Sequence, residues 1–433
     1  MAQTEPPIGS GSTAGGEGTA GSEGAAPESS PEIDPITAGL ESDTQALLSA
    51  HPVAEIRTEE DRFAFLEARY DAGLGAVHYP EGRGGRGLPR EYQLVVDEIL
   101  GAAGAPDNRP AHIIVNLGMA GPTILAAGTE EQQQRFMRQL WTGRDRWCQL
   151  FSEPGAGSDL AGLATRAVRD GDDWIISGQK VWTTLAHLAD YAILLARTDP
   201  TVPKHQGITY FLLDMKSPGV TVRPMRQITG EAEFNEVFLD EVRVPDAMRL
   251  GAEGEGWRLA NITLSNERSG STKSPRREGG PIHTLIQEWR TAPPEDRDPS
   301  YRDSIARAWV RAEAVRLAGI AVQRQMAQGP PPAEASALKL ASAETNKQIA
   351  SLAMETAETG ALIHPDGYAF HQPDFMSVET TGRSAGYSYL RTRANSIEGG
   401  TSEVLKNIIA ERILRLPREP RTDTAVPFTE VPR

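Results

Sequence analysis

The spacing of apolar residues changes twice along the chain, and these changes constrain the fold more than any other feature. From Ser42 to about Arg144 apolar residues recur at helical spacing, as in the segment 91–100. From Cys148 to Pro245 the chain breaks into short β-rich runs at the ~8–12-residue spacing of a small antiparallel barrel or sandwich. Helical spacing returns after Gly256 and continues almost to the end. The order predicts an α+β protein with a β domain between two helical domains.

Composition separates the first forty residues from the rest. Residues 1–40 contain eight glycines and six acidic residues but no Lys, Arg or aromatic residue. Because such a segment cannot bury enough apolar area to offset the entropy of ordering it, we expect a disordered, acidic, Gly/Ser-rich tail. The changes in spacing then predict an N-terminal helical domain at 41–146, a central antiparallel β domain at 147–252 and a C-terminal helical bundle at 253–433.

Some elements can be predicted individually. The segment 130–140 is rich in Gln, Glu and Arg, which predicts a polar surface helix. The Asp-Gly-Asp-Asp sequence at 170–173 predicts a turn between two strands. Five apolar or β-branched runs predict strands, at 174–176, 191–195, 208–213, 220–222 and 236–239.

Charge and cysteine content exclude several functions. The chain has 44 Lys and Arg against 59 Asp and Glu, a net charge of −15, whereas binding to nucleic acid needs a basic face. The single cysteine, Cys148, excludes a disulfide framework and a multi-thiolate metal site. The eight histidines lack metal-ligand spacing, so we expect no metal. No apolar run approaches the ~18–20 residues of a membrane-spanning helix, and no signal-peptide pattern is present, so we expect a cytoplasmic protein.

Two motifs at the start of the β domain indicate a ligand site. Leu150–Asp159 reads LFSEPGAGSD, and the exposed N–H groups of such a Gly-rich loop can hold an anion. Ser177–Thr184 reads SGQKVWTT, in which a tryptophan flanked by threonines could contact a flat aromatic ligand. Taken singly, the first motif is more often a simple connector and the second a core tryptophan under a strand end. No strand–GxGxxG–helix unit and no GxxxxGK loop is present.

Together, these motifs closely resemble the acyl-CoA dehydrogenase family. The resemblance continues through 204–209, 227–230, 234–238, 242–245 and 254–257, and it resumes at Gly400–Glu403 and Asn407–Arg412. It implies a fold with an N-terminal helical domain, a central antiparallel β domain and a C-terminal four-helix bundle. It also implies an FAD enzyme that removes one α and one β hydrogen from an acyl-CoA thioester and passes the electrons to an electron-transfer flavoprotein.

The resemblance also implies roles for individual residues. Phe151 and Ser152 match residues that meet the flavin ring, and Trp182, Thr183 and Thr184 match the wall of the isoalloxazine. Gly157 and Ser158 match the flavin and CoA phosphate side, and Thr401 matches a flavin-contacting threonine. Arg268 matches a residue on the CoA side, and the Gly399 N–H matches the oxyanion site.

The catalytic base departs from the most familiar members of the family. These members carry it immediately before Gly-Thr-Ser, where this chain has Gly399. One replacement is Glu267, which follows the apolar positions Trp257, Ala260 and Leu264 on one face of a predicted helix. Isovaleryl-type members carry their base at the position matching Glu267. The alternative is Glu398, one residue upstream of the usual position. An ion-paired structural role for Glu267 and an exposed one for Glu398 stay open.

A second departure concerns assembly. Homotetrameric members carry an Arg-x-x-Phe-Gly stretch that reaches the FAD of the neighbouring subunit, whereas Ser274–Pro281 has arginines but no Phe-Gly. The family's Gly-Gly turn is also degraded around Thr359–Gly360. Both losses resemble actinobacterial members that act on steroid or bulky acyl-CoA as two-chain heterotetramers. A homo- or heterotetramer is therefore expected. Two alternatives stay open, namely a non-catalytic partner subunit and a flavin oxidase or monooxygenase on the same fold.

Overall fold

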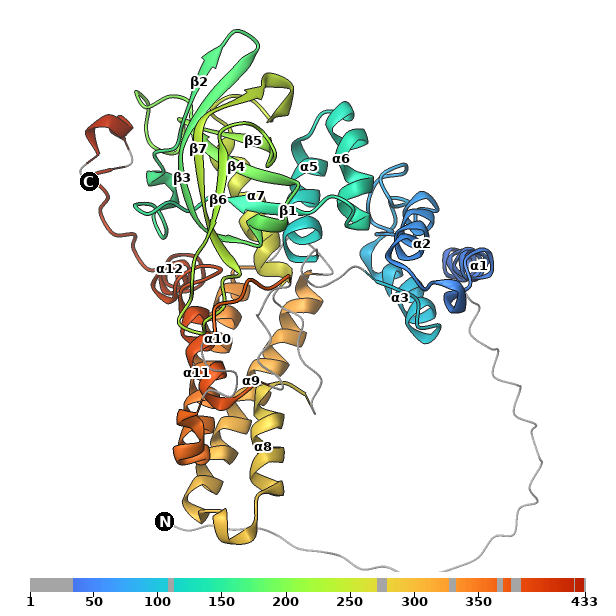
Figure 1. Cartoon of the computed structure of the whole chain (residues 1–433), viewed down its shortest axis with the longest axis vertical. Coiled ribbons are helices and arrows are strands. Elements are labelled where there is room, and N and C mark those ends of the chain that lie inside the picture. Colours follow the sequence, from blue (N-terminus) through green and yellow to red (C-terminus); the bar gives the residue numbers. More distant parts are fainter. Residues whose placement is uncertain are drawn as a thin grey trace, which may run out of the picture.

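The computed structural model describes residues 34–107, 113–270, 279–326, 332–363, 369–374, 383–423 and 425–431. In Figure 1 the β sheet lies at the top, the N-terminal helices lie beside it and the long C-terminal helices extend downwards. The predicted order of a helical part, a β domain and a second helical part is confirmed. No helix in these ranges is both long and apolar enough to cross a membrane.

Several of the N-terminal helices begin at polar caps and bury one face. Thr129 precedes α6, and its hydroxyl accepts from the Gln132 N–H while the Gln132 side chain accepts from the Thr129 N–H. The predicted polar helix is α6, but only its outer face is polar, since Phe136, Met137 and Leu140 are buried. The helices of this part are α1 (Pro35–Ala50), α2 (Glu59–Asp71), α3 (Gln93–Ala102), a π-helical segment (Ile113–Ala120), α5 (Gly121–Ala127) and α6 (Glu130–Thr142).

The predicted tail is wrong at its C-terminal end. Helix α1 begins at Pro35, and the Asp34 carboxylate accepts from the Ile36 N–H as its N-cap. Leu40 is buried in the core. Apolar burial of this kind offsets the entropy of ordering residues 35–40, which composition alone could not reveal. Residues 1–33 of the predicted tail lie outside the described residues.

The β domain is one connected sheet. Its strand order is β6-β7-β3-β2-β4-β5-β8, with β1 paired to β4. Pairings are antiparallel as predicted, except that β1 and β2 each pair with β4 in parallel. All five predicted strand runs lie in strands, and the predicted turn closes the β2–β3 hairpin through Gly171. The strands are β1 (Trp147–Leu150), β2 (Arg166–Asp170), β3 (Asp173–Thr184), β4 (Tyr191–Arg197), β5 (Ile208–Asp214), β6 (Val220–Pro224), β7 (Phe234–Pro245) and β8 (Arg249–Leu250).

Helix α7 (Gly256–Gly270) joins the three parts of the molecule. Strands β4 and β5 are buried along almost their whole length, as expected for strands covered on both faces. The hydroxyl of Thr263 on α7 lies 3.0 Å from the Tyr210 hydroxyl of β5 and 2.9 Å from the Thr123 hydroxyl of α5. These buried contacts fix α7 against both the sheet and the N-terminal helices.

The remaining helices form the predicted bundle. Helices α8, α9, α10 and α11 lie side by side, and Ile282, Leu285, Ile305, Ile349 and Leu352 form a core between the first three of them. The helices are α8 (Pro281–Thr291), α9 (Pro299–Met326), α10 (Glu334–Ala357), α11 (Ala385–Thr392) and α12 (Ser402–Ile408).

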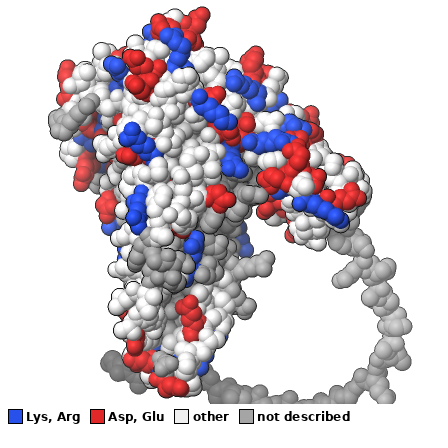
Figure 2. All heavy atoms as spheres, in the orientation of Figure 1, with Lys and Arg blue, Asp and Glu red and all other residues white. Residues whose placement is uncertain are grey.

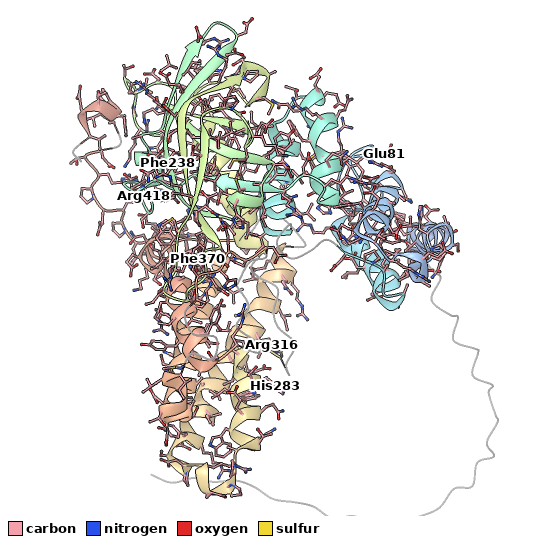
Figure 3. All side chains as sticks on the ribbon, in the orientation of Figure 1. Glu81, Phe238, His283, Arg316, Phe370 and Arg418 are labelled. Atoms are coloured by element: carbon pink, nitrogen blue, oxygen red, sulfur yellow. The ribbon has the colours of Figure 1, made fainter. Side chains whose placement is uncertain are left out.

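The chain then returns from α12 to the β domain, as Arg418 shows in Figure 3. We call residues 416–423 and 425–431 the C-terminal segment. Its Phe428 N–H donates to the Val202 carbonyl at 3.0 Å, so the end of the chain packs on a loop of the β domain.

Candidate active site

A buried ion pair holds the start of the Gly-rich loop. Lys180 Nζ on β3 donates to the Phe151 carbonyl at 3.0 Å and to the Glu153 carboxylate at 2.8 Å. The Glu153 carboxylate also accepts from the N–H groups of Ala164 and Thr165. Burial by itself would raise the pKa of Glu153, but Lys180 and these donors hold it below its usual value. Phe151 is buried, so its ring packs in the core and is not presented to a ligand.

The rest of the loop presents accessible backbone. The Ser152 carbonyl accepts from the Val181 N–H at 3.0 Å, which places the loop against the end of β3. Gly157 and Ser158 are exposed. No heavy atom of a non-neighbouring residue lies within 4 Å of the position that a Cβ would take at Gly155 or Gly157. A ligand can therefore approach this backbone closely.

The end of β3 presents an exposed aromatic side chain. Trp182 is 59% exposed although it lies within a strand, and its φ of 58° is uncommon for a residue other than glycine. Among the described residues, the buried Thr183 hydroxyl has no hydrogen-bond partner. Thr184 is half-buried. An exposed indole beside threonine hydroxyls and an open Gly-rich loop fits the ring system and phosphates of FAD.

The second part of the site is the loop that leads into α12. Thr401 caps this helix, because its hydroxyl accepts from the Val404 N–H. Gly399 and Gly400 precede it with φ values of 61° and 98°, which favour glycine. Glu267 reaches this loop from α7. A Cβ placed at Gly399 would lie 3.6 Å from Oε1 of Glu267.

The two candidate bases have different surroundings. Glu267 is half-buried, one turn beyond the buried Thr263 on α7. Glu398 accepts from both terminal nitrogens of Arg391, at 3.1 and 3.2 Å, and from the Asn395 amide at 3.0 Å. Arg391 is 4% exposed and lies 3.6 Å from the fully buried Glu233 of the β domain. Glu398 therefore belongs to a structural ion-pair network.

Lys339 on α10 was not identified from the sequence. Its Nζ donates to the carbonyls of Asn395 and Gly400 at 2.8 and 2.7 Å. Burial lowers its pKa, whereas the charges of Glu398 and Glu267 oppose that change. The available signal was a lysine four residues from both Ala335 and Ala343, on one face of a predicted helix.

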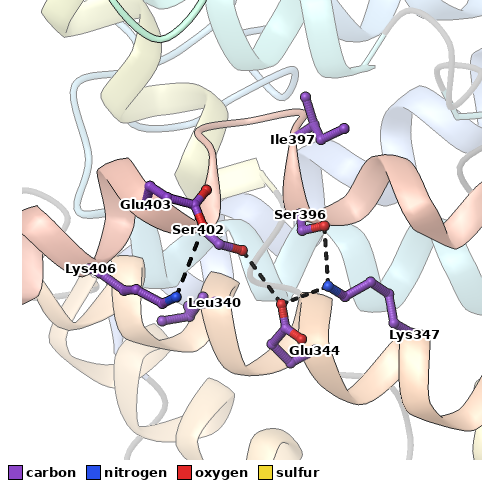
Figure 4. Close-up of a pocket in the computed structure, with 8 residues that line it drawn as sticks. All are labelled: Leu340, Glu344, Lys347, Ser396, Ile397, Ser402, Glu403 and Lys406. Atoms are coloured by element: carbon purple, nitrogen blue, oxygen red, sulfur yellow. Dashed lines mark hydrogen bonds and ion pairs between the residues drawn. The ribbon is translucent and has the colours of Figure 1, made fainter.

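A cavity of about 380 Å³ lies between α10, this loop and α12 (Figure 4). Its polar side chains bind one another, since Glu344 pairs with Lys347 at 2.8 Å and lies 3.5 Å from the Ser402 hydroxyl. Neither candidate base lines it. The Arg268 side chain lies outside the described part of the structure, as does most of Ser274–Pro281.

Comparisons with known proteins match all three parts of the chain to one family. Models of the N-terminal, middle and C-terminal domains of acyl-CoA dehydrogenase match residues 46–144, 148–242 and 254–414. The acyl-CoA dehydrogenase FadE34 of Mycobacterium tuberculosis is 42% identical over 376 residues, which are 85% of this chain and 48% of that protein. This chain thus spans about half the length of that relative.

Two further proteins match over most of their length. The acyl-CoA dehydrogenase IpdE1 of M. tuberculosis is 39% identical over 377 residues, covering 85% of this chain and 91% of that protein. The solved ChsE4–ChsE5 complex of M. tuberculosis has a TM-score of 0.65 and 29% identity, covering 91% of this chain and 100% of that chain. We conclude that the chain belongs to the acyl-CoA dehydrogenase family.

Proposed function

We propose that this protein is an FAD-dependent acyl-CoA dehydrogenase in which Glu267 removes the α proton of an acyl-CoA thioester. One observation carries the proposal. The Glu267 carboxylate lies beside position 399, the position from which the most familiar members of the family extend their base. A glutamate on α7 thus supplies a carboxylate close to where a side chain on the C-terminal loop would supply it.

The reaction requires three contributions. Glu267 takes the α proton, and the Gly399 N–H stabilises the thioester oxygen as enolate character develops. FAD, when bound, accepts the β hydrogen as hydride. A double bond then joins the α and β carbons, giving the trans-2-enoyl-CoA.

The contacts of Glu398 argue against it as the base. Both of its carboxylate oxygens accept hydrogen bonds from Arg391 or Asn395, so the side chain is held within this network and away from a substrate. Moving it toward a substrate would leave the buried Arg391 with less compensation.

Residues of the β domain would hold FAD. The exposed Trp182 would cover the flavin ring, with Thr183, Thr184 and the Phe151–Ser152 backbone at its edge. Gly157 and Ser158 would receive phosphate groups, and Thr401 would close the site from α12. The open space at Gly157 and the hydroxyl of Thr183 support this assignment.

We also propose that the protein works as a tetramer, in which a second acyl-CoA dehydrogenase-like chain could take part. Phe370, Ile397 and Leu414 are exposed apolar side chains that a partner could cover. In Figure 2, charged side chains crowd the N-terminal helices, while much of the visible face of the β domain and bundle is uncharged. A steroid or other bulky acyl-CoA is the proposed substrate class, and an electron-transfer flavoprotein is the proposed acceptor.

The first experiment is an anaerobic titration of the purified protein with straight-chain, branched and steroid acyl-CoAs while the visible flavin band is followed. Bleaching by one thioester supports the dehydrogenase. A colourless protein that cannot be loaded with FAD favours the non-catalytic partner, and rapid reoxidation of the bleached flavin in air favours an oxidase or monooxygenase.

The matched variants Glu267→Gln and Glu398→Gln then distinguish the two candidate bases. We expect Glu267→Gln to slow flavin reduction by about 10²–10⁴-fold, the usual contribution of a general base. Glu398→Gln should retain most of the rate at temperatures where it stays folded. The opposite ranking would assign the base to Glu398, and full activity of both variants would assign it to neither.

A further inference from the structure

We propose that Lys339 is a positioning residue for this reaction, because its ammonium group holds the loop 395–400 beside Glu267 and keeps the Glu267 carboxylate ionised. The inference rests on the function proposed above and assigns a role to a residue outside the base and the FAD contacts.

The hydrogen bonds of Lys339 define the shape of the loop. Its Nζ donates to the Asn395 carbonyl at 2.8 Å and to the Gly400 carbonyl at 2.7 Å. These two carbonyls lie at the two ends of the segment that contains Gly399. Because Gly399 and Gly400 both have positive φ, the segment needs tertiary contacts to keep one conformation. One ammonium group thus sets where the Gly399 N–H points.

The charge of Lys339 acts on Glu267. A Cβ at Gly399 would lie 3.6 Å from the Glu267 Oε1 and 3.7 Å from the Lys339 Cε, so both side chains reach the same point. The Lys339 ammonium group is within Coulombic range of Glu267, and its charge favours the ionised carboxylate, which is the form that accepts the α proton.

Other charged groups surround this pair. Glu398 of the loop and Lys347 of α10 also act on Lys339. Glu398 forms an ion pair with Arg391 of α11, and Arg391 also lies close to Glu233 of the β domain. Lys339 therefore acts on both carboxylates, Glu398 and Glu267, and Arg391 compensates Glu398 in addition.

The test measures the pH dependence of kcat/KM in the active assembly. Lys339→Gln removes the charge but keeps an N–H donor, and it should move the acid limb upward by about one pH unit, because the base loses its stabilising charge. Lys339→Arg keeps the charge and should leave the limb in place. Lys216→Gln, at an exposed lysine of the β domain that pairs with Asp190, is the matched control and should not move it. A lower rate with an unmoved acid limb in Lys339→Gln would overturn the proposal.

A second measurement does not depend on activity. Urea unfolding of Lys339→Gln, Glu267→Gln and the double variant forms a double-mutant cycle. At about pH 7 the double variant should lose less stability than the sum of the two single losses, and at about pH 3, where the carboxyl is protonated, the losses should add. Additive losses at both pH values would overturn the pairing of Lys339 with Glu267. An inactive wild type with non-additive losses would overturn the proposed function and leave the pairing intact.

Discussion

A Cβ at position 399 would meet no heavy atom of a non-neighbouring residue closer than 3.6 Å, and that nearest atom is Oε1 of Glu267. A side chain can therefore be placed there, although a φ of 61° costs a residue other than glycine about 1–2 kcal/mol. Side chains at position 267 on α7 and at position 399 on the C-terminal loop would therefore reach the same small region of the site.

This geometry predicts that the base can be relocated. In a Glu267→Gln background, Gly399→Glu should recover at least about tenfold of the lost rate of flavin reduction, because a carboxylate returns to the site from the other side. Gly399→Gln in the same background is the matched control, since it carries the same strain and bulk without a charge. Equal recovery in both double variants would show that the added carboxylate is not the base.

At the scale of elements, the C-terminal segment binds the β domain through a buried lysine. Lys204 is 1% exposed and pairs with Asp423 at 2.5 Å and with Asp159, beside Ser158 of the Gly-rich loop, at 2.7 Å. The Arg197 guanidinium lies 3.5 Å from the centroid of the Phe428 ring. The end of the chain thus supports the loop proposed to receive FAD phosphates.

Asp423→Asn should lower the free energy of unfolding by about 1.5–3 kcal/mol, the range of a hydrogen bond to a charged group. Hydrogen bonds from Arg421, which has the larger effect, and from Lys204 hold the pKa of Asp423 well below its usual value. Its stabilisation is therefore present above about pH 4 and is lost as the pH falls below that value.

Urea unfolding at about pH 7 and pH 3 checks this, since the gap between wild type and variant should narrow at the lower pH. Asp303→Asn, in the exposed Arg307–Asp303 pair, is the control and should change stability little at either pH. A gap that is equal at both pH values would contradict the assignment.

At the scale of the whole molecule, α11 joins the β domain to the C-terminal loop. Arg391 faces Glu233 of the β domain and Glu398 of the loop, and the Tyr387 hydroxyl donates to the buried Glu231 at 2.5 Å. Charges taken out of water at such a junction are costly when one partner is removed.

Arg391→Met should therefore destabilise the protein by about 3–5 kcal/mol, because two carboxylates lose a buried partner. It should also slow flavin reduction, because Glu398 adjoins Gly399. Thermal unfolding compares it with Arg307→Met, which removes an exposed arginine and should have little effect. Equal unfolding temperatures for the two variants would contradict the structural role of the Arg391 network.

Much of this architecture could be predicted because it depends on local spacing. The three-part order, the strand runs and the β2–β3 turn follow from residues close in the chain. The parallel pairing of β1 with β4 could not be predicted, since it joins residues about forty positions apart. Likewise, composition marked residues 35–40 as part of the tail, because the neighbours that bury Leu40 come from elsewhere.

The sequence by itself determined the family, the Gly-rich loop, the tryptophan at the end of β3 and the two glutamates that compete for the role of base. Only the tertiary structure separated those glutamates. It placed Glu267 beside Gly399, joined Glu398 to Arg391 and brought Lys339 to both ends of the loop. Sequence motifs are local, so residue types alone reveal them. The charged groups around a carboxylate, in contrast, depend on helices that pack together from distant parts of the chain.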